Sequence, residues 1–264
     1  MTSFEKLKKI QQTNNSRLCI GLDPQIEKLP KPIPKNIEGI FEFNKIIVEL
    51  TSKFVSAYKL NFAFYEQFGS NGIEILEKTL EIIPKSIVTI ADGKRADIGN
   101  TSKAYARAIY EHFRFDCATL NPYLGIDSIE PFFDFKNSLN FVLVVTSNAG
   151  SSDFQKLKIE EKFLYEIILD KLLTSFAVQN LGLVVGATNE SEFEKVRIIA
   201  KENFILVPGI GAQGGNLQNI LEYNRNQNLL VNVGRDIIFA SQDENFQDKI
   251  LQRTSFYFEK LKIF

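Results

Sequence analysis

Residues 90–106, with the sequence IADGKRADIGNTSKAYA, hold the densest set of side chains capable of acid–base chemistry. Asp92, Lys94 and Asp97 follow a D-x-K-x-x-D spacing directly after an apolar run. Residues two apart in a strand point to the same side, which places Asp92 and Lys94 on one face. Carboxylates beside a partly desolvated lysine favour its charged form, and such an ammonium suits general acid catalysis.

Two other interpretations of this cluster are a solvated turn with a helix N-cap and a metal site. The turn is disfavoured because the cluster follows a buried strand and would face Lys59 across the mouth of a barrel. Lysines between the carboxylates would compete electrostatically with a divalent cation, which prefers oxygen ligands. We therefore expect no metal here.

A second cluster, PGIGAQGG, contains a formal G-x-G-x-x-G at Gly209, Gly211 and Gly214. A dinucleotide fingerprint would follow the first strand, whereas this run follows the seventh apolar segment. The next apolar segment ends at Arg235, where a dinucleotide site would need an acid. Glycines after strand seven with a basic residue after strand eight match the usual phosphate site of a barrel, so Gln213 and Arg235 are predicted phosphate ligands. A merely flexible loop is the remaining alternative.

Eight short apolar segments recur along the chain, as strands buried on both faces require. They span residues 17–22, 55–60, 86–91, 115–120, 141–147, 182–187, 204–208 and 229–233. Helical periodicity between them covers 37–53, 99–113, 160–179 and 191–202. This alternation predicts an α/β fold, a single (β/α)8 TIM barrel over residues 1–264, with an open doubly wound sheet as the alternative.

A barrel places its active site at the carboxyl ends of its strands, so polar residues at those ends are the candidates. They gather there in an otherwise apolar pattern. They are Asp23, Lys59, Asn61, Asp92, Lys94, Asp97, Asn121, Thr146, Ser147, Asn148, Gln213, Arg235 and Asp236, with Pro208 and Gly234 beside them at the ends of the seventh and eighth strands. The proline-rich segment 23–36 is predicted to be a surface excursion, and residues 253–264 a helix packed on the barrel.

Composition excludes several classes of protein. The 264 residues carry 31 Lys and Arg against 32 Asp and Glu, without the basic excess of a nucleic-acid binder. No apolar run resembles a signal peptide or approaches the ~18 residues of a membrane span. Cys19 and Cys117 lie in apolar segments as buried cysteines do, so we expect a reducing, cytoplasmic setting. His112, the single histidine, falls in a predicted helix away from the strand ends.

Six segments together resemble the orotidine 5′-phosphate decarboxylase family, in its longer bacterial-type branch. They are GLDP (21–24), Lys59 with Asn61, DGKRADIGNT (92–101), VTSNAGS (145–151), VPGIGAQGG (207–215) and VGRDI (233–237). The resemblance covers essentially the whole chain. The D-x-K-x-x-D-I core is shared with related sugar-phosphate barrels, but the combination is more specific. Ala149 departs from the proline common in this family, which affects the stiffness of that loop.

The resemblance implies decarboxylation of orotidine 5′-phosphate to uridine 5′-phosphate without metal or organic cofactor. It implies that Lys59, Asp92, Lys94 and Asp97 form a catalytic network in which Lys94 protonates C6 of the pyrimidine. It further implies a homodimer in which Asp97, Ile98 and Thr101 reach the neighbouring site. The remaining substrate-binding positions are Asp23 and Asn61 near the ribose, Thr146 and Ser147 at the pyrimidine, and Pro208, Gln213, Gly234 and Arg235 at the phosphate.

Two alternatives remain open. A sibling barrel, such as a keto-sugar-phosphate decarboxylase or hexulose-phosphate synthase, would share D-x-K-x-x-D but use a metal with an acidic residue where Lys59 stands. A non-catalytic phosphate- or nucleotide-binding barrel would bind uridine phosphates without turnover. Lys59 argues against the first alternative, and the complete set of Lys59, Asp92, Lys94 and Asp97 argues against the second.

Overall fold

The computed structural model describes residues 1–211 and 215–264. Eight parallel strands form a closed barrel in the order β1-β10-β9-β8-β5-β4-β3-β2, which confirms the predicted TIM barrel over the open sheet. Each predicted apolar segment contains one of these strands, to within a few residues. The strands are β1 (Leu18–Leu22), β2 (Ala57–Asn61), β3 (Val88–Arg95), β4 (Cys117–Leu120), β5 (Leu139–Val145), β8 (Leu181–Val185), β9 (Ile205–Val207) and β10 (Leu229–Val233).

The contacts within the chain define two compact units. One contains Met1–Phe4 and Lys94–Asn232, and the other contains Glu5–Gly93 and Val233–Phe264. Helix α1 (Ser3–Thr13) begins in the first unit and continues in the second.

The unit of Glu5–Gly93 with Val233–Phe264 joins the first three strands to the C-terminal helices. Strand β2 pairs with β1 through Lys59 opposite Gly21, and with β3 through Asn61 opposite Asp92. Its helices are α2 (Ile37–Thr51), α3 (Ala63–Glu66), α4 (Gly69–Ile82), α11 (Arg235–Ile238) and α12 (Phe246–Leu261). The proline-rich excursion holds one 3₁₀ turn, η1 (Ile26–Lys28), and the predicted C-terminal helix is confirmed as α12.

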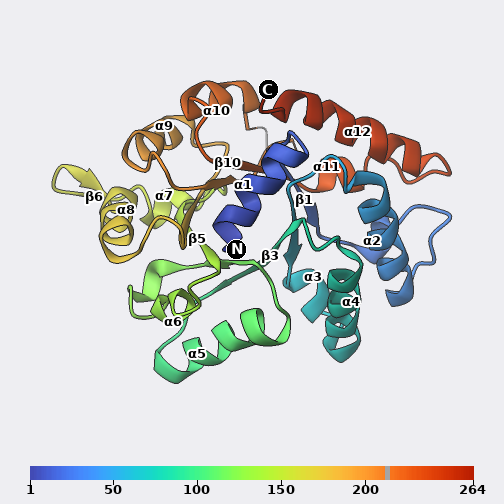
Figure 1. Ribbon diagram of the computed structural model, residues 1–264, viewed down its shortest axis with the longest axis horizontal. Coiled ribbons are helices and arrows are strands. Elements are labelled where there is room, and N and C mark those ends of the chain that lie inside the picture. The colour runs from blue at the N-terminus through green and yellow to red at the C-terminus, as the bar shows by residue number, and fades with distance from the viewer. Residues whose placement is uncertain (212–214) are drawn as a thin grey trace. The chain divides into compact units, whose positions relative to one another are not determined.

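Aromatic packing ties the C-terminal part of this unit to α2. The Phe43 ring of α2 stacks on Phe239 with 5.9 Å between centroids and lies 6.3 Å from Phe246 of α12. Helices α2 and α12 accordingly contact each other, at the right of the view (Figure 1). Burial of these rings stabilises the segment that carries α11.

The unit of Lys94–Asn232 carries the remaining strands and helices. The helices are α5 (Gly99–Arg107) with a π-helical turn at Ala108–His112, η3 (Pro122–Leu124), α6 (Glu130–Phe133), α7 (Ser151–Phe154), α8 (Leu164–Ser175), α9 (Glu190–Ile199) and α10 (Leu217–Asn224). Strand pairing within it runs from β4 to β5, from β5 to β8, and from β8 through β9 to β10.

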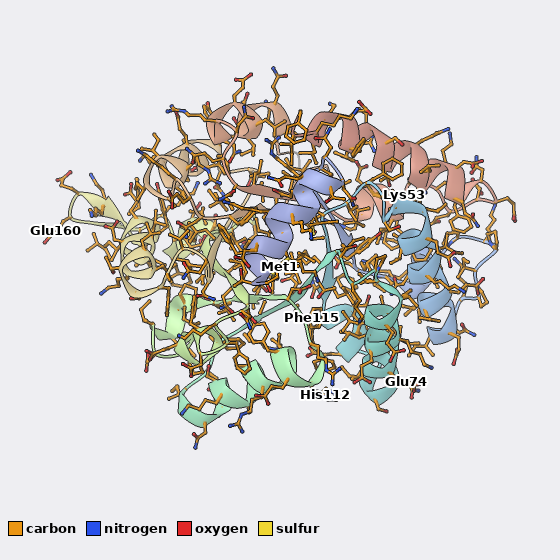
Figure 2. All side chains as sticks on the ribbon, viewed as in Figure 1. Met1, Lys53, Glu74, His112, Phe115 and Glu160 are labelled. Atoms are coloured by element: carbon orange, nitrogen blue, oxygen red, sulfur yellow. The ribbon has the colours of Figure 1, made fainter. Side chains whose placement is uncertain are left out.

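Three local features differ from or extend the sequence predictions. The helix expected over 160–179 is preceded by a short hairpin, β6 (Lys158–Ile159) with β7 (Lys162–Phe163), whose tip carries Glu160 (Figure 2). His112, which the sequence placed in a helix, is exposed at the end of the π-helical turn that follows α5 (Figure 2). Within residues 1–211 and 215–264, no helix is both long and apolar enough to cross a membrane.

Candidate active site

The ends of β1, β2 and β3 bring together a lysine and two carboxylates, which we call the Lys59 cluster: Lys59, Asp23 and Asp92. Lys59 is only 4% exposed, and its Nζ donates to Oδ2 of Asp92 at 2.5 Å. The same Nζ lies 3.9 Å from Oδ1 of Asp23. The register explains the proximity: Lys59 on β2 lies opposite Ile90 on β3, and Asp92 lies two residues further along β3, so both side chains leave the same face of the paired strands. Asp92 is itself buried, and its carbonyl accepts from the backbone N–H of Phe62.

The charge of Lys59 depends on these carboxylates. Burial by itself lowers the pKa of the ammonium. The negative charges of Asp23 and Asp92 raise this pKa by more than burial lowers it, so it lies above its ordinary value. The cluster is therefore a fixed, charged ion-pair network inside the fold. Beneath it, burial raises the pKa of the Cys19 thiol, which stays protonated.

Strand β10 ends beside the Lys59 cluster. A Cβ built on Gly234 would lie 3.7 Å from Oδ2 of Asp23, so the backbone at Gly234 approaches that carboxylate closely. Arg235 follows as the exposed first residue of α11. The structure thus brings Asp23, Lys59, Asp92 and Gly234 together and places Arg235 next in the chain.

Helix α11 is anchored from α12 through the residue after Arg235. Oδ2 of Asp236 accepts from Nε and Nη2 of Arg253 at 2.9 and 2.6 Å, and also from the Tyr257 hydroxyl. Burial, followed by the hydrogen bond to Asp236, raises the pKa of Tyr257 to about 12. The phenol therefore remains a donor at neutral pH and holds Asp236 in place.

Lys94 leaves regular strand geometry, although it lies within β3. Its φ is +47°, in the left-handed region, so the simple alternation expected for residues 92 and 94 does not apply. Its backbone N–H donates to Oγ1 of Thr119 on β4 at 3.0 Å, and its side chain is exposed. Lys94 therefore lies exposed at the end of its strand.

The segment after β3 carries Asp97, Ile98 and Thr101 into the start of α5. Oδ1 of Asp97 accepts from the Ile98 N–H at 2.7 Å, and its own N–H donates to the Ser128 carbonyl at 3.3 Å. Thr101 is exposed, and the apolar side chain of Ile98 is 70% exposed. The carboxylate is therefore oriented by its own chain, beside an apolar surface.

The loop after β5 is held by two amide side chains that the sequence predictions missed. Oε1 of Gln155 accepts from the Thr146 N–H at 2.8 Å, and Nδ2 of Asn189 donates to the Thr146 carbonyl at 2.8 Å. Ser147 packs against Gly186, where a Cβ would lie 2.5 Å from the Ser147 nitrogen. No sequence signal distinguishes Gln155 or Asn189, because their role depends on contacts with a distant strand end.

The described part of the glycine-rich segment leaves β9 at Pro208, whose carbonyl accepts from the Ala187 N–H at 2.9 Å. Gly209 and Gly211 have φ of +98° and +85°, a backbone conformation that suits glycine. Gly215 has room only for hydrogen, since a Cβ would lie 2.3 Å from that of Ala187. The predicted phosphate ligand Gln213 lies outside the described residues.

His, Cys, Asp and Glu are the side chains that most often bind metal ions in proteins. No set of three or more is arranged to hold a metal ion among residues 1–211 and 215–264. The two carboxylates of the Lys59 cluster both have the Lys59 ammonium as counter-ion, at 3.9 Å from Asp23 and 2.5 Å from Asp92. The arrangement suits electrostatic work and proton transfer.

Comparison with known proteins decides the family. Residues 16–248 match the family model described as the orotidine 5′-phosphate decarboxylase / HUMPS family. A curated orotidine 5′-phosphate decarboxylase of Dehalococcoides mccartyi is 47% identical over 253 residues, which cover 93% of this chain and 92% of that protein. The chain belongs to the orotidine 5′-phosphate decarboxylase family. The resemblance seen in the sequence motifs and the predicted class of enzyme, a carboxy-lyase, are thereby confirmed.

Solved structures of this family have the same fold. The orotidine 5′-phosphate decarboxylase of Leishmania donovani has a TM-score of 0.84 and 32% identity, covering 98% of this chain and 100% of that chain. The UMP synthase of the same organism has a TM-score of 0.86 and 34% identity, and the match covers 98% of this chain but 57% of that chain. The similarity therefore extends through nearly all of the barrel.

Proposed function

We propose that this protein converts orotidine 5′-phosphate to uridine 5′-phosphate, without a metal or organic cofactor, through Lys94 and the Lys59 cluster. The bond between C6 of the pyrimidine and its carboxylate breaks, CO2 leaves, and the electron pair remains on C6. The Lys94 ammonium transfers a proton to C6 and becomes a neutral amine, which regains its proton from solvent. The observation that carries the proposal is the buried lysine held charged between two carboxylates.

The carboxylates have two tasks in this proposal. Asp92 and Asp97 lie near the carboxylate of the substrate and orient the lysines, so their negative charge opposes the bound substrate more than the transition state. Lys59 limits this repulsion and keeps Asp92 fixed at 2.5 Å. A prearranged set of charges stabilises developing charge without reorganisation during the reaction.

Substrate recognition is divided among the strand ends. We assign Asp23 and Asn61 to the ribose, and Thr146 and Ser147 to the pyrimidine. Pro208, Gln213, Gly234 and Arg235 would hold the phosphate. The hydrogen bonds from Gln155 and Asn189 support the pyrimidine assignment, since they fix the backbone of the Thr146 loop. The close approach of Gly234 to Asp23 supports a ribose next to the phosphate.

The active form proposed here is a homodimer in which Asp97, Ile98 and Thr101 serve the site of the neighbouring copy. An Ile side chain that is 70% exposed beside a half-buried aspartate supports this assignment, because burial against a partner would remove that apolar surface from water. We further propose that residues 1–264 act as one barrel domain, in the cytoplasm.

The alternative function is that of a sibling sugar-phosphate barrel, because the family model that matches this chain is described as orotidine 5′-phosphate decarboxylase / HUMPS. That reaction class would use a metal with an acidic residue where Lys59 stands. Curated relatives with 41–47% identity named orotidine 5′-phosphate decarboxylase favour the proposed reaction. Activity on orotidine 5′-phosphate in excess EDTA, followed by pyrimidine absorbance, separates the two, because only the metal-dependent reaction stops.

The decisive variant is Lys94→Ala. It removes the proton donor and leaves the phosphate contacts, so turnover should be lost while uridine 5′-phosphate still binds. Calorimetric titration measures the binding and absorbance measures the turnover. Retention of more than about a few per cent of wild-type turnover would remove Lys94 from its assigned role.

A further inference from the structure

The backbone at Lys94 is in an unfavourable conformation for a residue with a Cβ. Its φ of +47° lies in the left-handed region, which residues other than Gly, Asn and Asp rarely adopt. Such a conformation persists only when neighbouring groups impose it, and it is frequent where a side chain must be aimed. The residue concerned is the lysine to which we assign the proton transfer.

The Thr119 side chain of the neighbouring strand β4 hydrogen-bonds this backbone. Oγ1 of Thr119 accepts the Lys94 N–H at 3.0 Å, and Thr119 is only 2% exposed. Just beyond this point, the Asn121 N–H donates to the Arg95 carbonyl at 3.2 Å, which is an ordinary backbone bond between β4 and β3. At Lys94, therefore, the acceptor on β4 is a side-chain hydroxyl, whereas at Arg95 the bond joins backbone groups.

Thr119 is well suited to hold a fixed position. It lies on β4 opposite Phe141 of β5, in a strand whose residues are all buried. Its branched side chain has few accessible rotamers, so the hydroxyl direction is restricted. None of the catalytic or substrate contacts proposed above involves Thr119.

We propose that Thr119 is a positioning residue that keeps Lys94 in its left-handed conformation and thereby aims the ammonium. The proposal rests on the proposed function, in which Lys94 delivers the proton. Without the hydroxyl, the Lys94 N–H loses its acceptor and the backbone can relax toward ordinary strand geometry. The side chain then leaves the face on which proton transfer occurs, while the phosphate and pyrimidine contacts stay in place.

The test compares Thr119→Val, which removes the acceptor at nearly constant shape, with Thr119→Ser, which keeps a hydroxyl. Thr119→Val should lower kcat about 10- to 100-fold, as a misplacement of ~1 Å does, with KM for orotidine 5′-phosphate near the wild-type value. Thr119→Ser should restore most of kcat. The matched control is Thr254→Val, a buried threonine on α12 that donates to the Ile250 carbonyl at 2.8 Å; its kcat should not change.

Amide hydrogen exchange gives an independent readout. The Lys94 amide should exchange slowly in the wild type and in Thr119→Ser, and much faster in Thr119→Val. If Thr119→Val does not fold, Thr119→Cys takes its place, since a thiol of similar volume is only a weak acceptor. The same kcat loss is expected for it.

Parallel measurement of Lys94→Ala separates the two proposals. If Lys94→Ala keeps its turnover, the proposed function fails. If Lys94→Ala loses turnover but Thr119→Val keeps the wild-type kcat, the positioning role alone is overturned. A Thr119→Val effect confined to KM, or absence of rescue by serine, would also overturn it.

Discussion

The Lys59 cluster predicts a large and pH-dependent loss of stability for Lys59→Met. Lys59 is buried, with Asp92 Oδ2 at 2.5 Å and Asp23 Oδ1 at 3.9 Å, so its replacement removes the positive charge that compensates these two carboxylates. Removal of one partner from a buried ion pair costs about 3–5 kcal/mol. With an m-value of about 3 kcal/mol/M for a chain of this size, the urea midpoint should fall by about 1–1.7 M at pH 7.

The pH dependence follows from the sign of the carboxylate shifts. In Lys59→Met, the carboxylates of Asp23 and Asp92 lose the nearby positive charge that favours their ionised form, so they take up a proton more readily in the folded state than in the wild type. A group whose pKa is raised on folding stabilises the fold at low pH and loses that effect as pH rises through the folded pKa. The loss in free energy of unfolding caused by Lys59→Met should therefore be smaller at pH 5 than at pH 7. The wild-type Lys59 stays charged in this window, because its pKa is raised.

The assay is urea unfolding at both pH values, with Lys31→Met as the matched control. Lys31 contacts Asp243 at 2.8 Å, but both side chains are about 70% exposed, so water and salt screen the pair and the midpoint should stay near wild type. Addition of Asp92→Asn to Lys59→Met should recover part of the loss. A loss below about 1 kcal/mol, or one that does not change with pH, would refute the electrostatic account of the cluster.

Three further outcomes are expected. Arg235→Ala should lower kcat/KM for orotidine 5′-phosphate by about 30- to 1,000-fold, since a charge-assisted phosphate contact contributes about 2–4 kcal/mol. The rate for phosphate-free orotidine should stay nearly unchanged. Equal losses on both substrates would contradict the phosphate assignment. Mixing inactive Asp97→Asn and Lys94→Ala chains should partly restore activity, because a mixed dimer contains one intact site; no recovery despite demonstrated subunit exchange would place Asp97 in its own chain's site. Cys19 and Cys117 are both fully buried, and burial raises the pKa of the Cys19 thiol. A thiol reagent should therefore modify these cysteines only after the protein unfolds. Rapid modification of the folded protein would show that the strands open.

Sequence patterns predicted the elements of this fold well where the signal is local. A strand buried on both faces needs a short continuous apolar run, and each of the eight predicted runs overlaps one barrel strand, with ends that differ by up to a few residues. Local patterns predicted less well where one segment contains two kinds of element. The sequence indicated a helix over 160–179, but the hairpin of β6 and β7 precedes α8 there. The π-helical turn at Ala108–His112 also has no signal in the periodicity.

Side chains that act through distant partners could not be inferred in this way. Thr119 lies 25 residues from Lys94, and Gln155 lies 9 residues from Thr146, at separations that no regular element relates. One signal was present for Thr119, a polar residue within an otherwise apolar strand segment, but it does not indicate which group the hydroxyl contacts.

The sequence by itself determined the order of strands and helices, the family and the residues that collect at the strand ends, because these follow from local periodicity and from motif spacing. Only the tertiary structure decided that Lys59 is buried between Asp23 and Asp92, and that Lys94 takes a left-handed conformation against Thr119. The physical reason is that burial, ion pairing and backbone strain depend on strand register, which places side chains from separate segments within a few ångströms of each other.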